Sequence, residues 1–228
     1  NVDEDSVYAR NSKDGFQSDI PGSTLGSDFS IDADYVAGGA LRWALPIDGL
    51  RVSGTYRTAE AEVTSSIAAS YLPDGTGNFH SDVKEATVWV ASIEYSWMDL
   101  TLTAEYAEDK IDLATGIVGM GAPSEITLHS AGWYVQASWR FTDWFAASLA
   151  YAEFYPDKDD KDGTNNTFKS DAWEKDYALT MRFDINEYCI FKVEGHYVDG
   201  TARVLTQDNT DRTRDDFTYG VAKVTFSF

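Results

Sequence analysis

The sequence predicts an all-β fold, an antiparallel transmembrane β-barrel, on the strength of three observations. Segments in which apolar and polar residues alternate recur from about Ile31 to the end of the 228-residue chain. Short turns and long polar connections separate these segments alternately. Aromatic residues gather at two heights along the expected strands. Antiparallel strands joined in this way place all short turns at one end and all long loops at the other, as in barrels that cross a membrane.

About nine strands are expected, near residues 33–45, 50–65, 83–97, 100–113, 127–141, 144–155, 172–184, 188–205 and 216–228. The short turns lie at 45–49, 97–99, 141–143 and 184–187, and the long connections lie near 66–82, 108–125, 156–171 and 206–215. Residues 1–30 are expected to form an acidic extracellular loop or a weak additional strand, and residues 31–228 to hold the barrel strands.

The odd strand count matters because closed bacterial barrels normally have an even number of strands. We favour a larger barrel of roughly 16 to 18 strands, of which this chain is the C-terminal portion. The alternative is a small closed barrel in which residues 5–11 supply a tenth strand.

The fifth expected strand shows the alternation most clearly. Trp133, Val135 and Trp139 fall on one face, and Gln136 and Arg140 fall on the other. Such alternation also describes a soluble barrel or sandwich whose apolar face points inward. The fold class therefore needs a second criterion.

Aromatic placement is that criterion, because a soluble core is uniformly dry and has no reason to sort its aromatic residues by height. Eight steps of about 3.3 Å at a tilt of about 45° place Tyr35 roughly 19 Å above Trp43, comparable to the apolar band between two aromatic girdles. The predicted membrane-interface aromatics are Tyr35, Trp43, Trp89, Trp97, Trp133, Trp139 and Trp144. Two belts indicate two membrane interfaces.

Composition excludes several other classes. No stretch approaches the roughly 20 consecutive apolar residues of a membrane helix. The net charge of -20 argues against a nucleic-acid partner, since phosphate binding requires a clustered basic surface. The single cysteine, Cys189, cannot form an internal disulfide, and we expect it to be a small apolar strand residue.

The last nine residues place Gly220, Ala222, Val224, Phe226 and Phe228 on one face of a strand. This ending resembles the C-terminal signature of outer-membrane β-barrels, in which Phe226 and Phe228 would be the signal read by the barrel-assembly machinery. The segment 191–202 resembles the penultimate strand of porins of the phosphate-selective and related groups. The resemblance implies a Gram-negative outer-membrane location, contact with outer-membrane lipid and lipopolysaccharide, and a homotrimer.

If the apolar faces point to lipid, the opposite faces line a pore. The predicted pore-lining residues are Arg42, Arg51, Arg57, Glu94, Glu105, Arg140, Arg182, Lys192, Glu194, His196 and Lys223. Most of the basic members lie in the strand halves nearest the short turns, which favours a modest anion preference. The alternative is that these charges pair across the wall and merely keep the lumen hydrated.

Catalysis and metal binding find little support. His80, His129 and His196 are not accompanied by a serine elbow, by paired acids beside a loop histidine or by metal-ligand spacing. The acidic loop 157–163 departs from the EF-hand pattern because Lys161 stands at a ligand position and no Glu supplies the bidentate ligand. We expect a solvated loop, with weak divalent bridging to lipopolysaccharide as the alternative. No enzyme activity, catalytic residue, metal or cofactor is predicted.

The function expected from these observations is a water-filled channel through which small hydrophilic solutes and ions diffuse passively. The alternative is a barrel that acts as a scaffold or sleeve for a partner protein or an electron-transfer conduit. A channel would carry an inward-folded loop that narrows its own pore, whereas a sleeve would be filled by another chain.

Overall fold

A computed structural model describes residues 23–72, 74–204, 208–209 and 214–227. Its elements are β1 (Ser23–Leu25), β2 (Ser30–Ala44), β3 (Leu50–Ala69), β4 (Thr76–Trp97), β5 (Leu100–Ile117), β6 (Ser124–Thr142), β7 (Phe145–Tyr155), the 3₁₀-helix η1 (Lys169–Ala172), β8 (Glu174–Asn186), β9 (Cys189–Asp199) and β10 (Asp216–Phe226). The nine expected strands correspond to β2 to β10, so the all-β prediction is confirmed. Within this part of the chain, no helix is long and apolar enough to cross a membrane.

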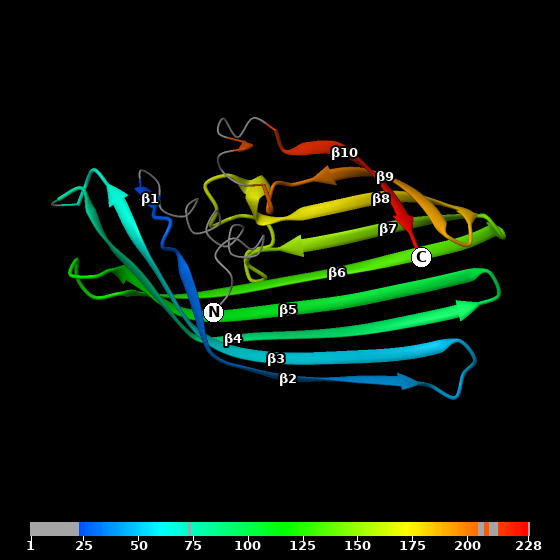
Figure 1. Ribbon diagram of the computed structural model, residues 1–228, viewed down its shortest axis with the longest axis horizontal. Helices are drawn as coiled ribbons and strands as arrows, with labels where there is room; N and C mark the ends of the chain where they lie inside the picture. The colour runs from blue at the N-terminus through cyan, green and yellow to red at the C-terminus, as the bar shows by residue number, and fades with distance from the viewer. Residues whose placement is uncertain (1–22, 73, 205–207, 210–213, 228) are drawn as a thin grey trace.

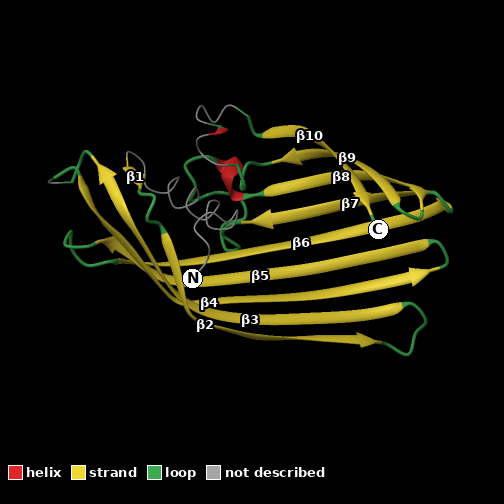
Figure 2. Cartoon of the chain, in the orientation of Figure 1, coloured by secondary structure: helices red, strands yellow, loops and turns green. Residues whose placement is uncertain are grey.

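From β3 to β10, every strand pairs antiparallel with the next one in sequence, and β1 and β2 both lie along the remaining edge of β3. Figures 1 and 2 show the consequence: the four short turns lie together at one end of the sheet and the longer connections at the other. Among the described strands the sheet is open, with β2 and β10 at its two edges. Both edge strands run toward the short-turn end.

Two of the expected long loops are shorter than predicted. The strands β3 and β4 extend to Ala69 and Thr76, and β5 and β6 extend to Ile117 and Ser124, so the predicted connections 66–82 and 108–125 are mostly strand. These extensions bend away from the line of the sheet at the left of Figure 1. These extensions are rich in polar residues, as loops are. The sequence pattern therefore did not show that the strands continue beyond the length needed to cross a membrane.

Residues 26–29 separate β1 from β2 and stand opposite only two residues of β3, so they form a bulge along its edge. The backbone N–H of Gly26 donates to the Ser66 carbonyl at 2.7 Å. The Asp28 carboxylate accepts from the Ser66 N–H at 2.9 Å and from the Ser66 hydroxyl at 2.7 Å. These two donors lower the pKa of Asp28, with the hydroxyl as the larger cause. The ionised carboxylate of Asp28 is therefore a stronger acceptor for the Ser66 amide than the neutral acid.

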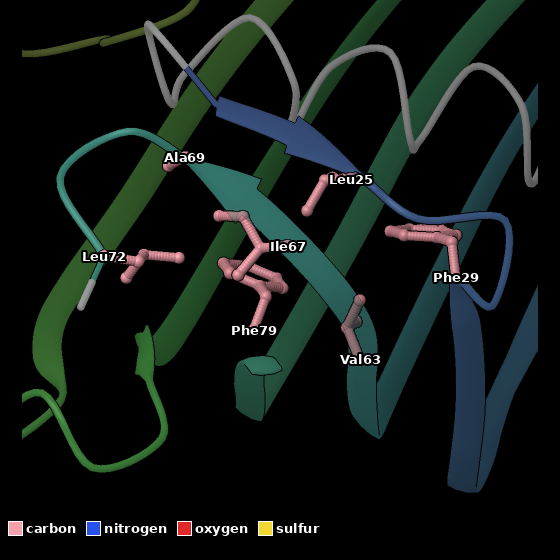
Figure 3. Packing of buried hydrophobic residues seen from close by; sticks show 7 residues of the cluster. All are labelled: Leu25, Phe29, Val63, Ile67, Ala69, Leu72 and Phe79. Carbon is pink, nitrogen blue, oxygen red and sulfur yellow. The ribbon is translucent and has the colours of Figure 1, made fainter. Parts of the chain in front are cut away.

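The buried apolar cluster lies in these extensions and not in the main sheet (Figure 3). It consists of Leu25, Phe29, Val63, Ile67, Ala69, Leu72 and Phe79. Val63, Ile67 and Ala69 project from the same face of β3, and β1 pairs with the edge of β3 so that Leu25 lies directly opposite Ile67. This cluster gives the polar extensions a core of their own.

The apolar face of the main sheet is exposed. The aliphatic side chains of Leu41 and Leu149, for example, belong to residues that are 72% and 65% exposed. Ring contacts run across one belt beside the short turns, through Phe141, Trp144, Phe145, Phe183 and Phe191. A second belt runs further up the strands through Trp89, Tyr106, Trp133, Tyr151, Tyr177 and Tyr197. Soluble proteins rarely expose an apolar band of this extent.

The polar face is the sheltered one. Along β8, Tyr177, Leu179 and Met181 of the apolar face are exposed, whereas Ala178 and Thr180 of the polar face are less so. A curved sheet shields the side chains on its concave side, so the polar face is concave. This antiparallel sheet has a polar concave face and, on its other face, an apolar band between two aromatic belts. Such a sheet is the wall of an outer-membrane β-barrel.

Candidate functional site: the polar face of the sheet

The cross-strand register places all the predicted pore-lining residues on the polar face. Arg51 lies directly opposite Glu94, and the same row continues across β5 to β8 to reach His196. Arg42 and Glu105 belong to the next row up, and Arg57 lies two rows above that. The guanidinium of Arg51 lies 3.7 Å from the Glu94 carboxylate, with both side chains well exposed.

A row of basic side chains crosses the polar face beside the short turns. It consists of Arg140 on β6, Arg182 on β8, Lys192 on β9 and Lys223 on β10. Ala146 of β7 lies between the two arginines, so no bulky side chain separates them. We call these four residues the basic row.

One carboxylate offsets part of this charge. The Asp184 carboxylate accepts from Arg182 Nε at 2.7 Å and from Arg140 Nη2 at 2.9 Å. Lys192 and Lys223 lie directly opposite each other, and neither appears in an ion pair with any described residue. The row therefore keeps an excess of positive charge, and part of the predicted charge pairing is present as well.

The polar face is acidic and aromatic higher up. His196 lies between two carboxylates, with Nδ1 2.9 Å from Asp176 and Nε2 3.6 Å from Glu194. Its ring stacks on Tyr219 with a centroid distance of 4.3 Å and an interplanar angle of 5°. Asp176 lies in the expected strand 172–184, but it was not among the predicted pore-lining residues. The alternation of Asp176 with the polar-face residues of β8 was the available signal.

The segment after β9 folds onto the polar face. The predicted strand 188–205 is wrong beyond Asp199, because Gly200 adopts a φ of +102° that ends the extended conformation. The Thr201 N–H donates to the Ser170 carbonyl at 2.7 Å, and the Thr201 hydroxyl donates to Asp171 at 2.7 Å. We call residues 200–204 the inward turn.

Arg203 is the residue by which the inward turn reaches the wall. Its guanidinium carbon lies 4.3 Å from the centroid of the Phe154 ring, and Nη1 lies 3.3 Å from the Glu174 carboxylate. Phe154 and Glu174 are directly opposite each other on β7 and β8 and belong to the polar face. Nothing in the sequence pairs Arg203 with these residues.

The other two histidines lie away from the polar face of the main sheet and also contact carboxylates. His129 Nε2 lies 2.7 Å from Glu108, which also accepts from Lys158 at 2.7 Å. His80 Nδ1 lies 3.3 Å from Glu62 in the extension. Each of these two histidines therefore has a carboxylate partner within the wall. The described residues contain no group of three or more His, Cys, Asp or Glu side chains arranged to hold a metal ion.

The acidic loop 157–163 uses its carboxylates to cap its own backbone. Asp160 accepts from the N–H groups of Thr164 and Asn165 at 2.9 and 3.0 Å. The Asp162 carboxylate accepts from the Thr164 hydroxyl at 2.7 Å, which lowers the pKa of Asp162. Local turn formation therefore accounts for these acids.

Of the predicted interface aromatics, Trp43 and Trp97 lie on the apolar face toward the short turns, and Trp144 lies in the turn before β7. Tyr35, Trp89 and Trp133 lie further up, and Trp139 is directly opposite Leu100 near the short turns. Phe226 is on the apolar face of β10. Phe228 and residues 1–22, which include the proposed tenth strand at 5–11, lie outside the described residues.

No family model and no curated protein matches the sequence. Among solved structures, the chain is similar to OmpT, an outer-membrane protein of Vibrio cholerae, as a loop L8 deletion mutant and as an in-vitro folded form. Both similarities have 12% identity and cover 82% of this chain, with TM-scores of 0.43 and 0.44. They cover 62% and 64% of the OmpT chains, so this chain spans less than two thirds of that length. The outer membrane channel DcaP of Acinetobacter baumannii is similar at 12% identity and a TM-score of 0.40, over 91% of this chain and 70% of that one.

Proposed function

We propose that the protein forms a water-filled channel through which small hydrophilic solutes and ions diffuse passively across the outer membrane. The observation that supports this most directly is the sheltered polar face, which carries charged side chains on every strand from β2 to β10 except β7. Charges at membrane depth are costly unless they face protein or water. A passive channel needs no catalytic residue and no cofactor.

The inward turn is the second support. It lies against Phe154 and Glu174 on the polar face, where it would narrow the pore. A barrel that serves as a sleeve for another protein has no use for a segment that occupies its own lumen. The channel is therefore preferred over the sleeve.

The two edge strands support a larger barrel. The hydrocarbon of a bilayer cannot satisfy the open edges of β2 and β10, so other strands must pair with them. Both edges run toward the short turns, so antiparallel closure requires an odd number of further strands. A second copy in the same orientation would pair its edges in parallel. We propose a barrel of roughly 16 to 18 strands.

The basic row is the proposed source of selectivity. Four cationic side chains and one carboxylate in a confined lumen attract anions and repel cations. We propose a modest anion preference at the short-turn end, which is the periplasmic end of the channel. If the charges paired completely, this preference would vanish.

Planar-bilayer recording of the purified protein tests both proposals. We expect discrete conductance steps. In a KCl gradient, we expect a reversal potential that is shifted from zero toward the equilibrium potential of chloride. The double variant Lys192→Gln/Lys223→Gln should move that potential toward zero, and the exposed control Arg214→Gln should leave it unchanged. Absence of conductance would favour the sleeve, and cation selectivity in the unmodified protein would refute the anion preference.

We also propose the interactions that the resemblance implies: a homotrimer, lipopolysaccharide and lipid around the apolar band, and assembly machinery that reads Phe226 and Phe228. Substituting both phenylalanines with Ala should lower the folded, heat-modifiable fraction in outer membranes. An unchanged folded fraction would contradict the assembly role. Cross-linking in native membranes would report the oligomer.

A further inference from the structure

The polar face contains a recess that selectivity by the basic row does not explain. It has a volume of about 510 Å³ and lies over β6 to β8. Its floor is made of small residues, Gly132, Ala150, Ala152 and Ala178, and its walls include Tyr134 and Phe154. Small-molecule sites typically occupy about 300–1,000 Å³ and combine apolar lining with a few polar groups. The recess has the size of such a site.

The sequence builds the recess through one glycine. Gly132 lies directly opposite Phe154, and a Cβ at this position would lie 3.1 Å from the Glu153 carbonyl and 3.5 Å from the Phe154 ring. The absence of a side chain therefore leaves room for the ring beside the sheet, with its face toward Arg203 at 4.3 Å. An aromatic face attracts cations electrostatically.

The charge around the recess is mostly negative. Glu105, Asp109, Asp176 and Glu194 line it, and Glu174 borders it through Arg203. Its basic side chains already contact carboxylates, since His196 contacts Asp176 and Glu194, and Arg203 contacts Glu174. The near end of the recess, at Thr180 and Glu194, lies two residues, or roughly 7 Å, from Arg182 and Lys192, whereas Glu174 lies eight residues along β8, or roughly 26 Å, from Arg182. The end of the recess beside Phe154 and Glu174 is therefore well apart from the basic row.

Arg203 shows which chemistry the recess accepts. Its guanidinium lies over the Phe154 ring and beside the Glu174 carboxylate, on an aliphatic stem. The Arg203 side chain is nevertheless 61% exposed, whereas that of Glu174 is only 12% exposed. The anionic partner is thus largely enclosed, whereas the cationic partner comes from a turn and is open to solvent.

We propose that the recess binds organic cations with an ammonium or guanidinium group on a short apolar stem, and that Arg203 is a tethered competitor for the same place. The cation takes the Phe154 face and the Glu174 carboxylate, and its stem lies along Ala152 and Ala178. Arg203 then turns into the open lumen. This assignment rests on the proposed channel, because it requires a lumen that solutes enter.

The test is block of single-channel current in planar bilayers. The probes are n-butylguanidinium chloride, its neutral isostere n-butylurea, and butyrate. We expect concentration-dependent block by n-butylguanidinium alone. Arg203→Ala removes the competitor, so half-block should occur at a concentration about 5- to 30-fold lower, the occupancy ratio that a cation–π contact of this kind sets. Phe154→Leu should raise the half-block concentration by about 5-fold or more.

Arg214→Ala is the matched control, because Arg214 is an exposed arginine of the segment that follows the inward turn and lies outside the recess lining. It should leave the half-block concentration unchanged. Equal block by the urea and the guanidinium would overturn the proposal, and so would cation block that neither Arg203→Ala nor Phe154→Leu alters. A protein that conducts without any block refutes the recess alone, whereas a protein without conductance refutes the proposed channel.

Discussion

The substitution Leu149→Arg tests which face of the sheet meets lipid. Leu149 lies in the middle of β7, on the apolar face, and is 65% exposed. Phe145 lies one belt below it and Tyr151 one belt above it, and both make ring contacts within their belts. Position 149 is therefore close to the midplane of the apolar band.

The expected cost follows from that depth. Arginine on the lipid face of a barrel destabilises it by about 2–4 kcal/mol at the bilayer midplane. This corresponds to a roughly 30- to 1,000-fold fall in the folding equilibrium constant. In a soluble sheet, replacing an exposed Leu with Arg would change the stability by no more than about 0.5 kcal/mol.

The control is Gln136→Arg. Gln136 adjoins Ala137, which lies directly opposite Leu149, so the two positions share one depth while Gln136 belongs to the polar face. Its new guanidinium would remain in water, with a change within about 0.5 kcal/mol. The measurement is urea unfolding of protein folded into lipid vesicles, followed by Trp fluorescence. Equal stability of Leu149→Arg and Gln136→Arg would refute the assignment of the faces.

Three further predictions concern the bulge, the basic row and the inward turn. Gly200→Ala would place a Cβ 2.0 Å from the Trp173 carbonyl, so the inward turn should leave the wall and the single-channel conductance should rise; an unchanged conductance would show that the turn does not narrow the pore. Asp184→Asn should strengthen the anion preference, because among the described residues Asp184 is the carboxylate that pairs with the basic row, and an unmoved reversal potential would contradict this. Asp28→Ala should speed hydrogen exchange at the Ser66 amide about 2- to 5-fold near pH 7, since the exposed carboxylate contributes about 0.5–1 kcal/mol. Because the pKa of Asp28 is lowered in the fold, the contribution of its charge is present above the ordinary carboxyl pKa of 3.8 and is lost as the pH falls through the lowered value. The difference between the two proteins should therefore shrink at low pH, and a difference of unchanged size would contradict this role of the charge.

Much of the fold follows from local pattern. The side chains of a strand alternate between two faces, so the sequence around Trp133 and Gln136 already assigns each residue to a side. Turn lengths assign each strand a direction. The boundaries were less accessible, because the polar extensions of β3 to β6 carry the same residues as loops and are held by the separate cluster around Ile67.

The candidate site was only partly predictable. The sequence placed Arg182 and Lys192 on the polar face, but it could not show that Asp184 would bridge Arg140 and Arg182 across β7. It also left Asp176 out of the predicted pore-lining residues, although the expected strand 172–184 contains it, because the contact of Asp176 with His196 on β9 follows from the register alone. Both depend on which residues stand side by side in different strands.

The sequence by itself determined the strands, their two faces, the aromatic belts and the end at which basic side chains gather. These features depend on the geometry of a single strand, which repeats every two residues. Only the tertiary structure decided the register that aligns Lys192 with Lys223 and the turn that carries Arg203 to Phe154. Register depends on bulges and turns along the whole sheet, and the inward turn depends on the left-handed conformation of Gly200 and on hydrogen bonds to residues about thirty positions away.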